Sequence, residues 1–185
     1  MPAKPARILD AAIAVIEDGG MQALTQPRVA ARADMRQSHL TYYFPTRDDL
    51  VTAVAERIVT LRTAAVNTAT AADDPFEALT DMLVDPRQTR LLTGLVEIAD
   101  KNPAIAQSFS TLRSAMGEFG DRLLVLLGKA STPAARDLLQ VTSTGIAVLA
   151  LGNGGTAFRS TAIAALEALF DALPPEPTHI GGDRA

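Results

Sequence analysis

Four dipeptides in which a helix-capping residue directly precedes proline divide this 185-residue chain into helical segments. They are Asp74-Pro75, Asp85-Pro86, Asn102-Pro103 and Thr132-Pro133. Asp, Asn and Thr side chains accept hydrogen bonds from the free N–H groups at a helix start, and proline suits the first helical position. With Gly19-Gly20 as a stop signal, they predict about nine helices, near residues 5–18, 26–33, 37–43, 47–68, 75–84, 86–100, 103–127, 133–152 and 161–173. No strand pattern competes, so the predicted fold class is all-α.

Composition agrees with packed helices in a reducing compartment. Hydrophobic residues make up 48% of the chain and aromatic residues 4%, which favours helix packing over sheets. The absence of cysteine excludes disulfides and thiolate metal sites. Because no apolar leader begins the chain, we expect a cytoplasmic protein. Polar residues and glycines interrupt the longest uncharged run, residues 138–158, which predicts a buried helix rather than a membrane span.

Apolar residues at steps of three and four predict bundle helices in the two longest segments. The first segment carries Leu50, Val54, Ile58 and Leu61. The second carries Ile105, Phe109, Leu112, Met116, Phe119, Leu123 and Leu126, which form one seam along a single helix.

Residues 24–50, LTQPRVAARADMRQSHLTYYFPTRDDL, hold the strongest functional signal. The two short helical segments at 26–33 and 37–43 have the spacing of a helix-turn-helix. Asp34 stands in the turn, where glycine is usual, because Asp tolerates a left-handed backbone. Thr46 and Asp49 predict a capping box at the next helix start, where Arg47 adds a phosphate-binding charge.

Charge is distributed unevenly along the chain. The net charge is -4, but residues 26–47 carry Arg28, Arg32, Arg36 and Arg47 against Asp34 alone. A basic island on an acidic body is consistent with nucleic-acid binding by that segment.

These residues resemble the TetR family of bacterial transcription regulators over roughly the first 55 positions. The resemblance rests on Thr25, Val29-Ala30, Ala33 and Leu40, and on Tyr43-Phe44-Pro45 followed by Arg47, Asp49 and Leu50. It implies a three-helix DNA-binding domain at residues 1–46, a helical effector-binding and dimerisation bundle at residues 47–174, and a flexible tail at residues 175–185.

In the family, the second helix of the helix-turn-helix lies in the major groove of DNA. The resemblance therefore implies base contacts from Arg36, Gln37, His39 and Tyr42, and phosphate contacts from Thr25, Thr41, Tyr43 and Arg47. Thr41 replaces a common Tyr, and Arg36 replaces a Ser cap whose loss costs about 1 kcal/mol. We interpret Arg36 as a guanine or phosphate contact, with plain solvent exposure as the competing interpretation.

The family also places an effector cavity among its central helices and dimerises through its last two long helices. The implied pocket residues are Leu92, Val96, Phe109, Leu112 and Met116, with ordinary core packing as the alternative. The implied dimer interface is Leu138, Thr142, Gly145, Ile146, Leu149, Ile163, Leu166 and Phe170, with packing inside one chain as the alternative. Glu97 and Asp100 lie in an otherwise apolar helix; either one pairs with a cationic ligand, or both are simply solvated.

The leading hypothesis is a homodimeric transcriptional regulator, in its simplest form a repressor that a small, largely apolar effector releases from double-stranded operator DNA. The alternative is a helical ligand-binding protein without sequence-specific DNA binding. An enzyme is not expected, because the chain has no cysteine, two widely separated histidines and no Gly-rich phosphate loop or HExxH motif. We expect no cofactor, no metal and no membrane partner.

Overall fold

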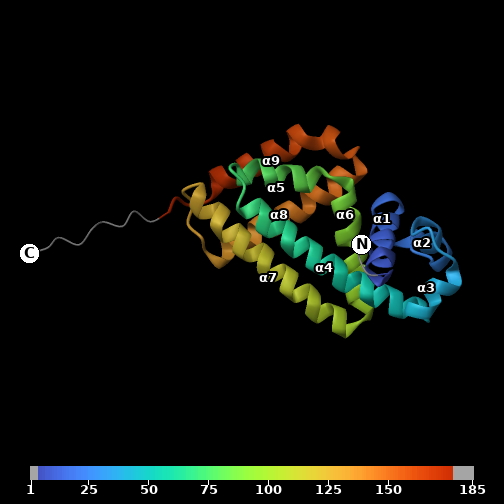
Figure 1. Ribbon diagram of the computed structural model, residues 1–185. Coiled ribbons are helices and arrows are strands. Elements are labelled where there is room, and N and C mark those ends of the chain that lie inside the picture. The colour runs from blue at the N-terminus through green and yellow to red at the C-terminus, as the bar shows by residue number, and fades with distance from the viewer. Residues whose placement is uncertain (1–3, 177–185) are drawn as a thin grey trace, which may run out of the picture.

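The computed structural model describes residues 4–176, except for the side chains of Ala104, Ser108 and Phe109. Over these residues the chain forms nine α-helices and no β-strand (Figure 1). The helices are α1 (Lys4–Gly19), α2 (Gln26–Arg32), α3 (Gln37–Tyr43), α4 (Arg47–Thr70), α5 (Pro75–Val84), α6 (Pro86–Lys101), α7 (Pro103–Leu126), α8 (Pro133–Gly152) and α9 (Arg159–Ala172). Short 3-10 turns, η1 (Met21–Ala23) and η2 (Gly155–Phe158), precede α2 and α9. The all-α prediction is confirmed.

Local side-chain chemistry begins the helices where the sequence predicted. Thr46 Oγ1 accepts a 3.0 Å hydrogen bond from the Asp49 N–H, and the Asp49 carboxylate accepts a 2.9 Å bond from the Thr46 N–H. Side chains of Asp74, Asp85 and Thr132 likewise accept backbone N–H bonds at the starts of α5, α6 and α8. Asp34 adopts φ +51°, so the predicted left-handed turn between α2 and α3 is confirmed.

Two hydrophobic clusters form the core, and α7 passes through both. The N-terminal cluster joins α1, α2, α3 and the first part of α4 to parts of α6 and α7. The C-terminal cluster joins α5, α8, α9 and the second part of α7. Met116 of α7 packs against both clusters. Helices α4 and α7 lie side by side and connect the helix-turn-helix end of the molecule to the opposite end (Figure 1).

The N-terminal cluster extends past the predicted domain boundary at residue 46. Leu50, Val54 and Ile58 of α4 belong to the same cluster as Ile8 of α1. The division into residues 1–46 and 47–174 therefore stays a prediction about folding units, because the packed core is continuous across it.

Two apolar positions predicted to be buried are exposed instead. Leu126 of α7 is 63% exposed, and Leu61 of α4 also faces solvent. Their neighbours Leu124 and Arg62 take the buried positions. A helix turns by about 100° per residue, so a shift of one or two positions moves a side chain from the packed face to the open one.

The first residues of the predicted tail pair with the loop that follows α7. The Ala130 N–H donates a 3.0 Å bond to the Pro174 oxygen, and the Glu176 N–H donates a 2.9 Å bond to the Gly128 oxygen. Residues 177–185 of the predicted tail lie outside the described part of the chain. Among residues 4–176, no helix has the length and apolar character that a bilayer span requires.

Candidate nucleic-acid interface and ligand cavity

One face of α3 is fixed against α1 and α2, which leaves its other face open. Leu40 is fully buried in the N-terminal cluster together with Val29 and Ala30 of α2. The Gln26 side-chain amide donates a 3.2 Å hydrogen bond to the backbone oxygen of Phe44, just after α3. Helix α3 thus has one packed face and one solvent-facing surface.

The residues implied as base contacts are exposed in this structure. Gln37, His39 and Tyr42 all face solvent, and Tyr42 is 80% exposed. Arg36 is the N-cap residue of α3, and its exposed side chain makes no capping hydrogen bond. Arg36 therefore does not replace the missing Ser cap, and its guanidinium is available to an outside partner.

Three of the four implied phosphate contacts also have available polar groups. Thr25 is the exposed N-cap of α2, but its side chain makes no capping bond. Arg47 is exposed at the first position of α4 and has no ion-pair partner among the described residues. Tyr43 packs edge-to-face on Tyr42, with ring centroids 5.1 Å apart, and this contact orients both rings.

Thr41, the fourth implied phosphate contact, is engaged inside its own helix. Its hydroxyl donates 3.2 Å hydrogen bonds to backbone oxygens of the preceding turn of α3. Arg32 is likewise engaged, because it forms a 3.1 Å ion pair with Asp18. Lys4 and Arg28, which the sequence analysis did not select, are exposed and without ion-pair partners in residues 4–176. The position of Arg28 inside the basic stretch was the signal for it.

The start of α4 keeps a carboxylate ionised beside this surface. Hydrogen bonds from the side chain and backbone of Thr46 lower the pKa of Asp49 below its ordinary value. The charge of Asp49 is satisfied locally by the capping box, which leaves Arg47 unpaired.

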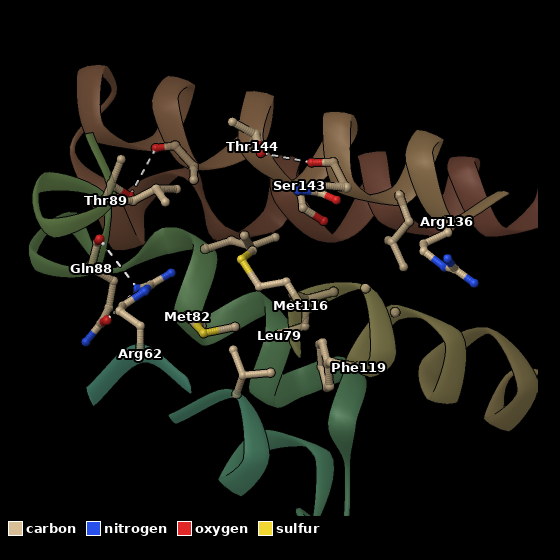
Figure 2. Close-up of a pocket in the computed structure, with 18 residues that line it drawn as sticks. Arg62, Leu79, Met82, Gln88, Thr89, Met116, Phe119, Arg136, Ser143 and Thr144 are labelled. Atoms are coloured by element: carbon tan, nitrogen blue, oxygen red, sulfur yellow. Dashed lines mark hydrogen bonds between the residues drawn. The ribbon is translucent and has the colours of Figure 1, made fainter. Parts of the chain in front are cut away.

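A cavity of about 50 Å³ lies in the C-terminal cluster and is lined by residues of α4, α5, α6, α7 and α8 (Figure 2). It has room for a few water molecules and is far smaller than the several hundred Å³ of a site for a drug-sized ligand. Its walls are mainly apolar and include Val66, Leu79, Met82, Phe119, Leu139 and Ala147. No Asp or Glu side chain lines it among the described residues.

The cavity includes two of the five implied pocket residues, Leu92 and Met116. Leu112 is fully buried in the N-terminal cluster and does not line the cavity. Val96 is 48% exposed and faces away from it. The side chain of Phe109 lies outside the described residues. The cavity lies farther along α7 than expected, because the first part of that helix packs tightly into the N-terminal cluster.

Arg62 is a buried cation on the cavity wall. Its side chain comes from α4 and is 5% exposed. Its Nη1 atom donates a 2.6 Å hydrogen bond to Oε1 of Gln88 and a 3.5 Å bond to the Gln88 backbone oxygen (Figure 2). The Nε atom is buried without a hydrogen-bond partner, and no described carboxylate forms an ion pair with Arg62. Burial lowers the pKa of this guanidinium, and the more distant charge of Asp85 partly offsets that effect.

The sequence analysis missed Arg62, although a signal for it exists. The four-residue spacing from Leu50 through Val54 and Ile58 continues to position 62 and then to Val66. A charged residue on an apolar stripe indicates a buried charge that needs a polar partner. The sequence analysis assigned Leu61 to the stripe in place of position 62 and therefore overlooked Arg62.

A second arginine, Arg136 of α8, lies at the other end of the cavity (Figure 2). Its Nε atom donates a 2.8 Å hydrogen bond to Asp121, which also raises the pKa of Arg136. Glu97 and Asp100, weighed as partners of a cationic ligand, are both exposed and do not line the cavity. Neither acid can serve as a counter-ion inside this cavity.

Helix α6 separates the cavity from the helix-turn-helix end. Gln88 and Leu92 line the cavity, whereas Leu91 packs in the N-terminal cluster. Between them, Arg90 donates a 2.7 Å hydrogen bond from Nη1 to the backbone oxygen of Glu17 in α1. Helix α6 therefore contacts both the cavity and α1, the helix on which α2 and α3 pack.

Helix α8 presents a stripe of exposed apolar side chains. The stripe consists of Leu138, Val141, Val148 and Leu149, with exposed Gly145 between them. Val141 is 70% exposed and, like Val148, was missed by the sequence analysis. The spacing of three and four residues from Leu138 through Gly145 was the available signal.

Other residues implied at the dimer interface lie inside the protein. Ile146, Leu166 and Phe170 are buried in the C-terminal cluster, so they pack within one chain. Thr142 and Ile163 are half-buried. Periodicity marks an apolar face but does not say whether the same chain or a second one covers it.

The fold and the exposed face of α3 define an all-α helix-turn-helix protein with a cavity-containing helical body. Residues 8–54 match the family model described as bacterial regulatory proteins, tetR family. Over 55 residues the chain is 46% identical to an HTH-type transcriptional regulator of Xanthobacter autotrophicus, a match that covers 30% of this chain and 27% of that relative. The resemblance of the N-terminal segment to the tetR family is therefore confirmed over residues 8–54, and the matched relative is covered over about a quarter of its length.

Solved structures are similar over nearly the whole chain. A transcriptional regulator from Rhodococcus sp. Rha1 has a TM-score of 0.73 at 18% identity, covering 91% of this chain and 95% of that one. A TetR-family member from Streptomyces coelicolor A3 has a TM-score of 0.61 at 26% identity, covering 91% and 98%. The multidrug binding protein EbrR, solved with proflavin, has a TM-score of 0.61 at 25% identity, covering 90% and 99%. The helical body as well as the helix-turn-helix therefore has the fold of these regulators.

Proposed function

We propose that this chain is a homodimeric transcriptional repressor that acts on operator DNA in the cytoplasm and is released by a small, largely apolar effector. The observation that carries the proposal is the open face of α3 in a helix-turn-helix that matches the tetR family model, in a fold whose helix α6 contacts both α1 and an internal cavity. Gln37, His39 and Tyr42 supply hydrogen-bonding and aromatic groups for base edges in the major groove. Thr25, Tyr43 and Arg47 bind the flanking phosphates.

Dimerisation is supported by the exposed stripe on α8. A contiguous set of large apolar side chains on a soluble domain usually marks a protein–protein interface. Gly145 lies within the stripe with open space around its Cα, so a second helix can approach closely there. In a symmetric dimer the two α3 helices would read half-sites about 34–36 Å apart, in successive major grooves.

The small volume of the cavity supports a mechanism in which a bound effector releases the protein from DNA. A ligand larger than a few water molecules has to displace the surrounding helices, among them α4 and α6. Helix α6 is tied to α1 by the Arg90 bond to Glu17, and α4 begins at Arg47 on the DNA-facing surface. Effector and DNA then oppose each other through one coupling energy, typically about 1–3 kcal/mol.

Selection of bound genomic fragments followed by gel-shift measurement tests the proposal. We expect a small set of fragments that share an inverted repeat, bound by two copies of the chain. Gln37→Ala should bind these fragments more weakly, with relaxed preference at one base pair of each half-site, but remain folded. Two outcomes for a folded dimer would contradict the proposal: it binds all fragments equally, or it binds no fragment even at low salt. A ligand-binding protein without sequence-specific DNA binding would behave in one of these ways.

A further inference from the structure

We infer that the cavity binds an amphipathic monocarboxylate, with the carboxylate paired to Arg62 and the hydrocarbon part lying against the apolar walls. The inference deepens the proposed function by giving the effector a chemical class, and it rests on that function only for the effect of the ligand on DNA. The class of ligand itself is argued from the side chains that surround the cavity.

The first argument is the missing counter-ion of Arg62. Buried charges in proteins are nearly always paired, because an isolated one costs several kcal/mol of solvation. Arg62 is 5% exposed and its only acceptors among the described residues are the two oxygens of Gln88, both neutral. A ligand that brings a negative charge would complete this environment.

The second argument is the edge of the guanidinium that remains available. Both bonds to Gln88 leave from Nη1, and Nε is buried without an acceptor. The Nε–Nη2 edge of Arg62 therefore has no partner in residues 4–176. Carboxylates bind arginine through two parallel N–H···O bonds along one such edge, so the open geometry matches this group.

The third argument is the distribution of charge around the cavity. No acidic side chain in the described part of the chain lines it, which disfavours a cationic ligand. Arg136 already forms its ion pair with Asp121, so it does not compete for the carboxylate. The wall between the two arginines is formed by residues such as Leu79, Met82 and Phe119, which accommodate a hydrocarbon chain (Figure 2).

The fourth argument is a route into the cavity from the surface. Gly117, Arg136 and Gln140 line both the cavity and an adjoining surface hollow between α7 and α8. The ligand enters at this end and reaches Arg62 at the inner end. The hydrocarbon part then lies along the apolar middle of the cavity, which has to widen by displacement of the surrounding helices because its volume is about 50 Å³.

The test compares ligands that share a chain and differ only in the head group. Hexanoate, octanoate and decanoate, their alcohols and their primary amines are titrated into the wild-type protein by calorimetry, and thermal midpoints are recorded. We expect at least one carboxylate to bind about ten- to a hundredfold more tightly than its alcohol, as hydrogen bonds between charged groups allow. The amine should bind more weakly than the alcohol. Equal affinity for carboxylate and alcohol, or no binding of any probe, would overturn the inference.

Arg62→Met keeps the aliphatic length of the side chain and removes the charge. We expect it to lose the preference for carboxylate over alcohol, whereas Arg57→Met, a matched control on the same helix that does not line the cavity, keeps it. Without ligand, Arg62→Met should have a higher thermal midpoint than wild type, because an uncompensated buried charge is gone. A lower midpoint together with a retained carboxylate preference would assign Arg62 a structural role. If Arg62→Met does not fold, the wild-type comparison of head groups alone decides.

DNA binding is measured separately, in the absence of any probe. A protein that binds carboxylates through Arg62 but no operator would contradict the proposed function and leave this inference standing. A protein that binds operator but shows no preference among the head groups would support the proposed function and contradict this inference.

Discussion

Arg90 and Glu17 are joined by a 2.7 Å hydrogen bond from the guanidinium Nη1 to a backbone oxygen in the last turn of α1. Carbonyl groups at a helix C-terminus lack partners within the helix, and a cation there is favoured by the helix dipole. Two residues earlier on α6, Gln88 holds Arg62 at the cavity. The connection between the cavity and α1 therefore passes through a single turn of α6.

Arg90→Met should reduce the effect of a bound effector on DNA affinity. The substitution removes the bond to Glu17 but retains most of the side-chain packing, so operator affinity without effector should change by less than a few-fold. The coupling free energy between a carboxylate probe and operator is expected to be about 1–3 kcal/mol in the wild type. In Arg90→Met this coupling should fall to roughly half of that value or less. Fluorescence anisotropy of labelled operator with and without probe measures both quantities. Lys101→Met, at the exposed end of α6, is the control, and an unchanged release in Arg90→Met would show that coupling uses another contact.

Arg47→Ala should weaken DNA binding to all sequences alike. A phosphate contact releases condensed counter-ions, so its loss lowers the slope of log affinity against log salt by about one unit per half-site. The measurement is operator and non-specific DNA affinity over a salt series. Arg32→Ala, which loses a side chain already paired with Asp18, should leave the slope unchanged. A normal slope in Arg47→Ala would remove this residue from the interface.

Gln37→Ala should change specificity rather than the salt slope. The side-chain amide of Gln37 is exposed at the first position of α3, where it can form a bidentate contact with an adenine edge. Its loss should cost about 1–3 kcal/mol on the operator and relax preference at one base pair of each half-site. Affinities for single-base operator variants give this directly. An unaltered preference at every position would mean that Gln37 does not contact a base edge, and that α3 does not lie in the major groove as proposed.

Leu149→Glu combined with Val141→Glu should produce monomers. Both side chains are exposed on α8, so the charges do not disturb the core of one chain but oppose a second apolar stripe. Sedimentation equilibrium at micromolar concentration measures the mass. Leu126→Glu places a charge at another exposed apolar position and should stay dimeric. A wild-type protein that already sediments as a monomer would contradict the proposed interface.

Gly155→Ala should destabilise the protein more than Gly20→Ala does. Both glycines have positive φ, +62° and +71°, which costs other residues about 1–2 kcal/mol. A Cβ on Gly155 would also lie 3.0 Å from Cδ of Pro86 and 3.2 Å from the Val84 oxygen, whereas nothing lies within 4 Å of one on Gly20. Urea denaturation should show an additional loss of about 1–3 kcal/mol for Gly155→Ala. Equal losses would mean that η2 and the start of α6 adjust freely.

The helices were predictable because their boundaries depend on local chemistry. The capping box of Thr46 and Asp49 and the left-handed turn at Asp34 need only neighbouring residues, and both are present. The cavity was not predictable in the same way, because its position depends on how α7 divides between two clusters. The burial of Arg62 could be predicted, because it is a charged residue on an apolar stripe. Its lack of a counter-ion could not, because that depends on how all the surrounding helices pack.

Arg47 and Arg62 lie on one uninterrupted helix, α4, at its outer end and at the cavity. Fifteen residues of rise separate them by roughly 22 Å. A rotation of α4 by about 5° around the cavity end would therefore carry its first turn through roughly 2 Å, a large fraction of a hydrogen-bond length. A rearrangement too small to change the shape of the helical body is thus enough to take the side chain proposed to bind phosphate out of reach of its partner.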